Sequence, residues 1–114
     1  MKKFILFIFF LLNLNLTASC VFTAKISGGD WSSSSTWNTN DCGGQTIPSD
    51  NSQVIIPVGS NVTVDIITST YINMILDIYG TITFNNGKKI NMCSGTVNLF
   101  DGGQTTGGNP GSKI

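Results

Sequence analysis

Residues 55–64, IIPVGSNVTV, show the pattern that decides the fold: an apolar strand ends at a glycine, and a second strand of alternating apolar and polar residues follows it. The same plan returns in residues 77–84, DIYGTITF, and in residues 91–99, NMCSGTVNL. The glycines of the three units are Gly59, Gly80 and Gly95, and their spacing is uneven. Strands are short and are bounded by turn residues, so each unit predicts two strands with a bend between them.

A strand repeat with a period of about 20 residues indicates stacked coils that share one apolar interior. The sequence therefore predicts a short, single-domain, all-β parallel β-solenoid. In this alignment residues 62–64, 82–84 and 97–99 are equivalent strands, and Thr63, Thr83 and Asn98 face outward as a small polar ladder. The alternative is an antiparallel β-sandwich, because hairpins also place glycine between short strands.

The composition agrees with a β-structure and argues against several functions. Of the 114 residues, 50 are Gly, Ser, Thr or Asn, and there is no Arg, Glu or His. Beyond residue 24 there is no Ala, whereas Ile, Val and Thr are frequent, which favours strands over helices. A zinc site built on His, a His-dependent catalytic triad and a basic nucleic-acid surface do not fit this composition.

The N-terminus has the layout of a secretory signal peptide. Lys2 and Lys3 precede an unbroken apolar run, FILFIFFLL, and a stretch that ends in small residues. This run is too short to span a bilayer, which needs about 20 apolar residues. We expect residues 1–24 to form the signal peptide, with cleavage between about residues 19 and 24. Lipidation of Cys20 is the less favoured alternative, since Thr17 stands where a lipoprotein has Leu, and only lipidation would bring the chain to a membrane.

The rest of the chain divides into three parts. Residues 25–103 are expected to form a β-rich extracellular module. Its first part, residues 25–53, is polar and irregular and contains both tryptophans, which suggests an N-terminal cap. Residues 104–114 are Gly-rich and predict a tail or the start of a truncated strand.

Residues 29–38, GDWSSSSTWN, together with Pro48 and the stretches VIIPVGSNVTVD and LDIYGTITF, resemble a pattern of secreted proteins. The pattern is that of the eight-glycine extracellular domain and of related surface modules of Gram-negative bacteria, and the likeness covers about residues 26–103. It implies a right-handed parallel β-helix-like module. Family members are often adhesin-like or attached to carbohydrate-active regions, and the family has no agreed catalytic residues.

The resemblance implies a secreted or surface-displayed structural or adhesion-type module without catalytic activity, on the outer surface of a Gram-negative-type bacterium. Its expected partners are cell-surface polysaccharides or other surface proteins, and not nucleic acids. The alternatives are a carbohydrate-binding module, or the N-terminal fragment of a larger adhesin or polysaccharide-degrading enzyme.

Trp31 and Trp37 are the candidate ligand-binding residues. Flat sugar faces stack on exposed indole rings, so the pair could form a carbohydrate platform. The competing interpretation, which the pattern favours, is that both tryptophans cover strand edges at the end of the fold. Exposure of at least one ring would indicate the platform, and burial of both would indicate the cap.

The cysteines and aspartates suggest two further sites. We expect a Cys42–Cys93 disulfide in an oxidising compartment; pairing of Cys20 with one of them is the rival if Cys20 survives cleavage. No cofactor is expected. A Ca²⁺ ion held by the aspartates of the polar segment is the minor possibility, although their spacing matches no known calcium loop. These aspartates are Asp30, Asp41 and Asp50.

Overall fold

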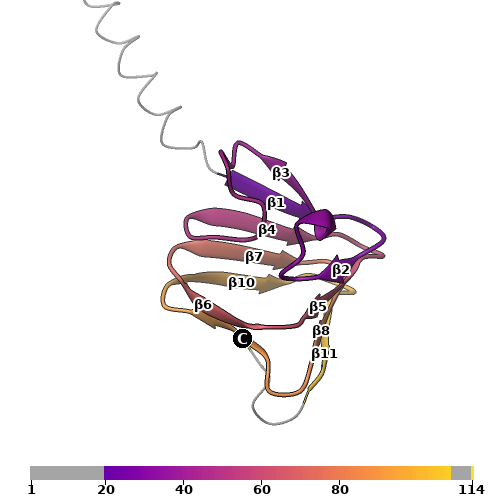
Figure 1. Ribbon diagram of the computed structural model, residues 1–114. Coiled ribbons are helices and arrows are strands. Elements are labelled where there is room, and N and C mark those ends of the chain that lie inside the picture. Colours follow the sequence, from indigo (N-terminus) through magenta and orange to yellow (C-terminus); the bar gives the residue numbers. More distant parts are fainter. Residues whose placement is uncertain (1–19, 109–113) are drawn as a thin grey trace, which may run out of the picture.

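The structure is a computed structural model that describes residues 20–108 and 114, and in these residues the fold is all-β with one 3₁₀ turn (Figure 1). The strands are short, as the frequent Gly and Asn turns predict. They are β1 (Cys20–Ala24), β2 (Gly29–Asp30), β3 (Trp37–Asn40), β4 (Ser52–Ile56), β5 (Asn61–Val64), β6 (Ile67–Tyr71), β7 (Met74–Ile78), β8 (Thr81–Phe84), β9 (Lys89–Met92), β10 (Gly95–Leu99) and β11 (Gln104–Gly107); the 3₁₀ turn is η1 (Ser34–Thr36).

The strands form three sheets. Sheet A has the order β10-β7-β4-β1-β3, sheet B the order β11-β8-β5-β2, and sheet C pairs β6 with β9. From β4 onward the chain visits sheets A, B and C in turn, so each later strand lies beside the strand three positions earlier. Figure 1 shows the sheet A strands one below another, from β3 at the top to β10.

Strand pairing among the described residues is parallel except between β1 and β3. In sheet A, Gln53 pairs with Ile75 and Met74 pairs with Gly95, so the chain returns to the same sheet after a similar length each time. The alternative of an antiparallel β-sandwich is therefore wrong, because such a sandwich is built from antiparallel hairpins.

The predicted alignment of the repeat is right for two strands and wrong for the third. Residues 62–64 of β5 pair with residues 82–84 of β8, as expected. Residues 97–99 instead belong to sheet A and pair with β7, while the strand beside β8 is β11. The repeat has three strands rather than two, because β6 and β9 form a third sheet. The strand β6, Ile67–Tyr71, carries too few apolar residues to stand out in the sequence.

The core consists of inward side chains that stack in columns across neighbouring strands. Val54 lies opposite Leu76 in sheet A, and Val62 lies opposite Ile82 in sheet B; all four side chains are fully buried. The regular alternation of buried and less buried residues in β4 and β5 follows from the two-residue period of a strand. Each strand thus covers the inward apolar residues of the neighbouring strand in its sheet.

Residues with positive φ mark the entry into three sheet A strands, β4, β7 and β10. Asn51 and Asn73 have φ values of 57° and 55°, and Gly95 has a φ of 132°. Asn tolerates this region better than most residues, and Gly enters it without a side-chain clash. The Asn73 side-chain amide donates to Oδ1 of Asn51 at 3.2 Å, which ties two successive bends together.

The two ends of the chain carry structure that the sequence analysis did not predict. The first strand, β1, pairs with both β3 and β4 and occupies residues 20–24, at the end of the expected signal peptide. The remainder of that segment, residues 1–19, lies outside the described residues. At the other end, β11 forms a strand where a Gly-rich tail or the start of a truncated strand was expected.

Candidate functional site

Trp31 and Trp37 lie together in the core near β3. They are 0% and 4% exposed, and their rings meet edge to face with centroids 5.3 Å apart. Nε1 of Trp37 donates to the carbonyl oxygen of Trp31 at 3.1 Å, and Nε1 of Trp31 donates to the Tyr71 hydroxyl at 3.0 Å. Because neither indole presents an open face, the expectation of a sugar-stacking platform at this pair does not fit, and the burial favours the cap.

A short 3₁₀ turn accounts for the meeting of the two tryptophans. The turn η1 lies between them and ends at Thr36, whose hydroxyl donates to the carbonyl oxygen of Asp30 at 2.8 Å. Before it, the backbone N–H of Ser32 donates to Oδ1 of Asp65 at 3.1 Å. The run SSSST thus forms a tight turn fastened to β2 and to the residue after β5, and both rings fall on the inner side.

Tyr71 receives the Trp31 hydrogen bond and is itself 4% exposed. Burial raises the pKa of its hydroxyl above the usual value of 10.0, because the charged phenolate would lose its water. Hydrogen bonds from Trp31 and Thr68 act in the opposite direction and are weaker. Tyr71 therefore serves as a neutral acceptor for the indole at neutral pH.

The disulfide joins Cys20 to Cys42, with their Cα atoms 4.5 Å apart, and Cys93 is free and exposed. The expected Cys42–Cys93 disulfide is wrong, and the rival pairing with Cys20 is correct. Its cause is the antiparallel pairing of β1 with β3, which sets Val21 opposite Asn40 and so brings Cys20 next to the turn after β3. The bridge is also incompatible with lipidation of Cys20, since the same sulfur cannot hold a lipid.

Polar side chains form two ladders on the outer faces of the sheets. On sheet B, the Thr83 hydroxyl donates to Oδ1 of Asn61 at 3.0 Å and lies 3.1 Å from the Thr106 hydroxyl. On sheet A, Asp77 accepts from Gln53 Nε2 and Asn98 Nδ2, both at 2.8 Å. The predicted ladder of Thr63, Thr83 and Asn98 is therefore divided between two sheets.

The aspartates considered for Ca²⁺ are separated by the fold. Asp30 lies in β2, Asp41 follows β3 with a φ of 57°, and Asp50 accepts a hydrogen bond from the Ile72 N–H at 3.0 Å. Within residues 20–108 and 114, no three cysteines or carboxylates gather in a position that could hold a metal ion. In the same residues, no helix is long and apolar enough to cross a membrane.

An exposed aromatic pair escaped the sequence analysis. The rings of Tyr79 and Phe100 stack face to face, with centroids 4.3 Å apart and planes 2° from parallel. The two residues are 36% and 39% exposed, and Val58 holds the equivalent bend of the preceding layer with 72% exposure. Positions 58, 79 and 100 are evenly spaced along the chain, and that regular apolar spacing just after β4, β7 and β10 was the available signal.

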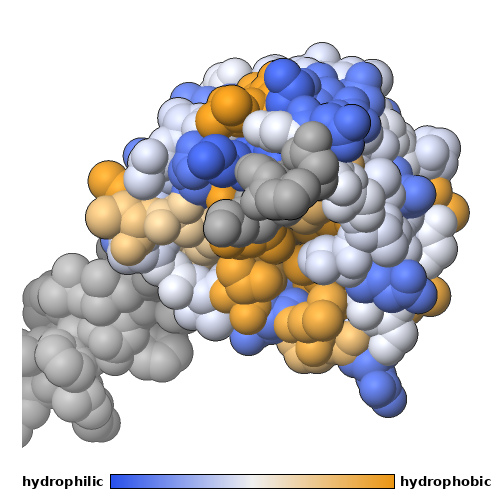
Figure 2. All heavy atoms as spheres, turned by 90° about the horizontal axis from the view of Figure 1, so that it is seen from below, coloured by the Kyte–Doolittle hydropathy of each residue, from blue (hydrophilic) through white to orange (hydrophobic). Residues whose placement is uncertain are grey.

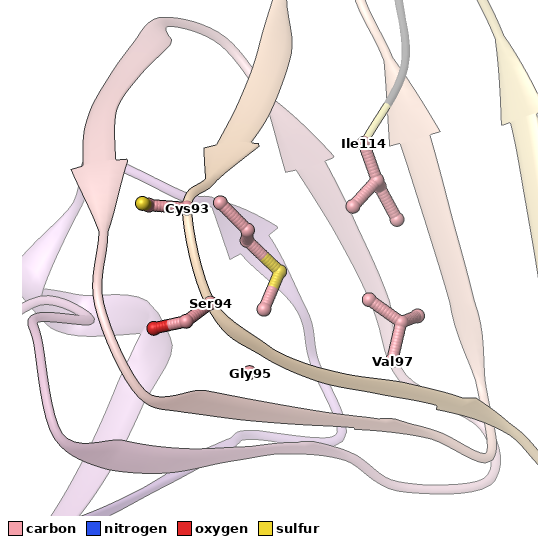
Figure 3. Close-up of a pocket in the computed structure, with 6 residues that line it drawn as sticks. Cys93, Ser94, Gly95, Val97 and Ile114 are labelled. Carbon is pink, nitrogen blue, oxygen red and sulfur yellow. The ribbon is translucent and has the colours of Figure 1, made fainter.

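The described residues also form a shallow hollow beside β10, with a volume of about 220 Å³. Figure 3 shows the side chains of Val97 and Ile114 turned toward each other across it, with the sulfur of Cys93 pointing away from them. The hollow is lined by Met92, Cys93, Ser94, Gly95, Val97 and Ile114. The lining is too open and too poor in paired polar groups to suggest catalysis.

Comparison with known proteins places the chain by a family model. No curated protein and no solved structure matches the chain. A family model matches residues 36–114, and its description is the G8 domain.

Proposed function

The chain belongs to the G8 domain family, and on that basis we propose that it is an extracellular β-module with a structural or adhesion-type role and no catalytic activity. The extracellular setting of the family agrees with the Cys20–Cys42 disulfide, because disulfides persist in oxidising compartments. Display on the surface of a Gram-negative-type bacterium is part of the proposal. Support for that part comes from the resemblance of the segments around Trp31 and Val54 to bacterial surface modules.

We further infer that the architecture is a right-handed parallel β-solenoid with three strands to a coil. Parallel pairing supports this inference: β4, β7 and β10 lie in register in sheet A, and β5, β8 and β11 lie in register in sheet B. Partners one repeat apart recur in all three sheets, as in Tyr71 and Met92 of sheet C. Stacked layers with a shared core would form a stiff element, which suits a structural role.

The observation that carries the structural role is the buried cap. Trp31, Trp37 and Tyr71 fill the core at the β3 end, and the disulfide fastens β1 to the residues after β3. These contacts make that end of the core closely packed and crosslinked, which suits a module exposed outside the cell.

Carbohydrate binding is the second candidate, and the Tyr79–Phe100 stack favours it. The outer face of an aromatic pair that is about one-third exposed could receive the apolar face of a sugar ring. Asp101 follows Phe100 directly and could accept hydrogen bonds from sugar hydroxyls. In this candidate the ligand site would lie at the bend after β10 rather than at the tryptophans.

A polysaccharide pull-down and glycan array separate the two candidates. The secreted protein is compared with a Tyr79→Ala, Phe100→Ala double variant and with Val58→Ala, which removes an exposed aliphatic side chain from the bend after β4. The structural role predicts no retention of any of the three proteins. Retention that the double variant loses while Val58→Ala keeps it, with all three folded by circular dichroism, would make the protein a carbohydrate-binding module.

A further inference from the structure

Strand β1 occupies an inner position in sheet A, between β3 and β4. It pairs antiparallel with β3 on one side and parallel with β4 on the other. Figure 1 shows β1 directly above β4, near the top of the molecule. Because a strand in this position contributes hydrogen bonds on both of its sides, β1 belongs to the folded module and not to the expected signal peptide.

The inward side chains of β1 are part of the core. Phe22 and Ala24 are 0% and 2% exposed. Phe22 lies opposite Val54 of β4, and its ring meets the Trp37 ring edge to face, with centroids 6.3 Å apart. Loss of Phe22 would leave a cavity between Val54 and Trp37, and a cavity of that size in a core is strongly destabilising.

The residue after β1 is held in place as well. The Lys25 N–H donates to the Thr36 carbonyl oxygen at 2.9 Å, and the Lys25 carbonyl oxygen accepts from the Ser60 hydroxyl at 2.7 Å. A chain that began at Lys25 would lack the whole of β1, and Cys42 would have lost its disulfide partner. The contacts on both sides of this point therefore require residues 20–24 in the mature protein.

The strand β1 also covers the inward residues of β4. Figure 2 views the molecule from below, the end at which β10 is the last described strand of sheet A, and hydrophobic atoms are visible on that surface. At the opposite end, β1 lies over β4, and Val54 of β4 is fully buried. Without β1, the inward face of β4 would come into contact with water, and burial of its apolar area would be lost.

The sequence offers two bonds at which the signal peptide could be removed. Signal peptidases take small side chains at the last and the third-last residue of the signal peptide. At the bond after Ser19 these residues are Ser19 and Thr17, and both are small. At the bond after Ala24 they are Ala24 and Phe22, and Phe22 is large. The side-chain sizes therefore favour the bond that leaves β1 intact.

We propose that a signal peptidase hydrolyses the Ser19–Cys20 peptide bond, so that the exported protein begins with β1. Water adds across the bond: Ser19 leaves with the signal peptide as a new carboxylate, and Cys20 gains a free α-amino group. The inference rests on the expected signal peptide. It goes beyond the proposed function, because it holds for a structural module and for a carbohydrate-binding module alike.

The test is export of the full chain in a Gram-negative host, with the product identified by N-terminal sequencing and intact mass. We expect Cys20 as the first residue, and before reduction the denatured product should present the thiol of Cys93 alone. A product that begins at any other residue, or that keeps the signal peptide, would overturn the proposal. A product that begins at Cys20 with the added mass of a lipid and a second reactive thiol would also overturn it, because Cys20 would then be lipidated and not bridged to Cys42.

Two matched variants test the named bond. Ser19→Phe places a large side chain at the last residue of the signal peptide, and Ala18→Phe places the same side chain at the neighbouring residue, whose size the peptidase does not select. In pulse labelling, we expect Ser19→Phe to yield the product that begins at Cys20 about tenfold more slowly than the parent, or slower still. Ala18→Phe should be processed at the rate of the parent. Unchanged processing of Ser19→Phe at this bond would overturn the proposal.

The folded state of β1 is tested by amide hydrogen exchange of the exported protein. Amides that are bonded within a sheet exchange only when that part of the sheet opens. The amides of β1 should therefore be protected to a degree similar to those of β4, its neighbour in sheet A. Exchange of β1 at the rate of an unfolded chain would contradict its place in the mature protein.

Discussion

Gly95 is a residue whose replacement the structure tolerates poorly. Its φ of 132° lies in a region that side chains rarely adopt, and a Cβ placed there would lie 2.0 Å from the carbonyl oxygen of Met74. The backbone of Met74 belongs to the strand beside β10 and cannot move aside without breaking the sheet. Close approach and backbone conformation therefore both require glycine at the entry of β10.

We expect Gly95→Ala to lower the free energy of unfolding by about 2 kcal/mol or more. The matched control is Gly87→Ala, which also replaces a glycine of positive φ, but there the added Cβ would meet no atom within 4 Å. Urea denaturation followed by tryptophan fluorescence measures both. Equal losses in the two variants would show that the contact with Met74 does not matter.

Tyr71 contributes stability that is lost at alkaline pH. Its raised pKa in the folded state means that the unfolded state loses the proton first as the pH rises above about 10. This contribution is therefore complete below pH 10 and is lost at higher pH, as the pH passes through the folded pKa. We expect the melting temperature to fall more steeply between pH 9 and 11.5 for the parent than for Tyr71→Phe. Parallel curves would contradict a buried, protonated Tyr71.

At the scale of the element, the Gln53–Asp77–Asn98 ladder joins three strands of sheet A through one carboxylate. Asp77 is only 7% exposed, and each of its oxygens accepts one side-chain hydrogen bond at 2.8 Å. Removal of the acceptor leaves two amide groups without their partner on a crowded sheet face, and such groups cost stability.

We expect Asp77→Ala to lower the free energy of unfolding by about 1–2 kcal/mol. Asp77→Asn, which retains one carbonyl acceptor and nearly the same shape, should lose less. Guanidinium denaturation of the two variants beside the parent gives the comparison. An Asp77→Ala variant as stable as the parent would mean that the ladder contributes no net stability.

The sequence predicted the strands whose inward residues are all apolar and missed those whose residues are mixed. The pairing of residues 62–64 with residues 82–84 follows from alternation that is visible in the sequence. β6 was missed because its buried positions include Thr68, and β1 because a signal peptide was expected to include it. The predicted disulfide was wrong for the same reason, because Cys20, the true partner of Cys42, lies in β1.

The candidate site was predictable only as a pair of alternatives. The short separation of Trp31 and Trp37 is compatible with either a platform or a cap, and the choice depends on Tyr71, a distant residue in the chain whose hydroxyl accepts from Trp31. Long-range packing of this kind has no local signature. The Tyr79–Phe100 stack, by contrast, follows from the even spacing of positions 58, 79 and 100 once three strands per repeat are recognised.

At the scale of the whole molecule, the Cys20–Cys42 bridge joins cysteines with a sequence separation of 22 and so closes a loop around the cap. In the chain-entropy view such a crosslink stabilises the folded state by about 3 kcal/mol, because it restricts the unfolded chain. We expect a Cys20→Ser, Cys42→Ser variant to melt at a clearly lower temperature than the parent. Cys93→Ser, which changes the exposed free thiol, should melt at the same temperature as the parent. Equal melting of all three proteins would show that the bridge is dispensable.

If the chain is exported N-terminus first, the long segment between β1 and β4 sets an order of assembly. Cys20 of β1 pairs with Ser52 of β4, whereas β1, β3 and both bridged cysteines all lie between positions 20 and 42. A small oxidised hairpin can therefore form outside the membrane before β4 has emerged. The hairpin then offers β4 the edge of β1, and β7 and β10 can add to the sheet in chain order.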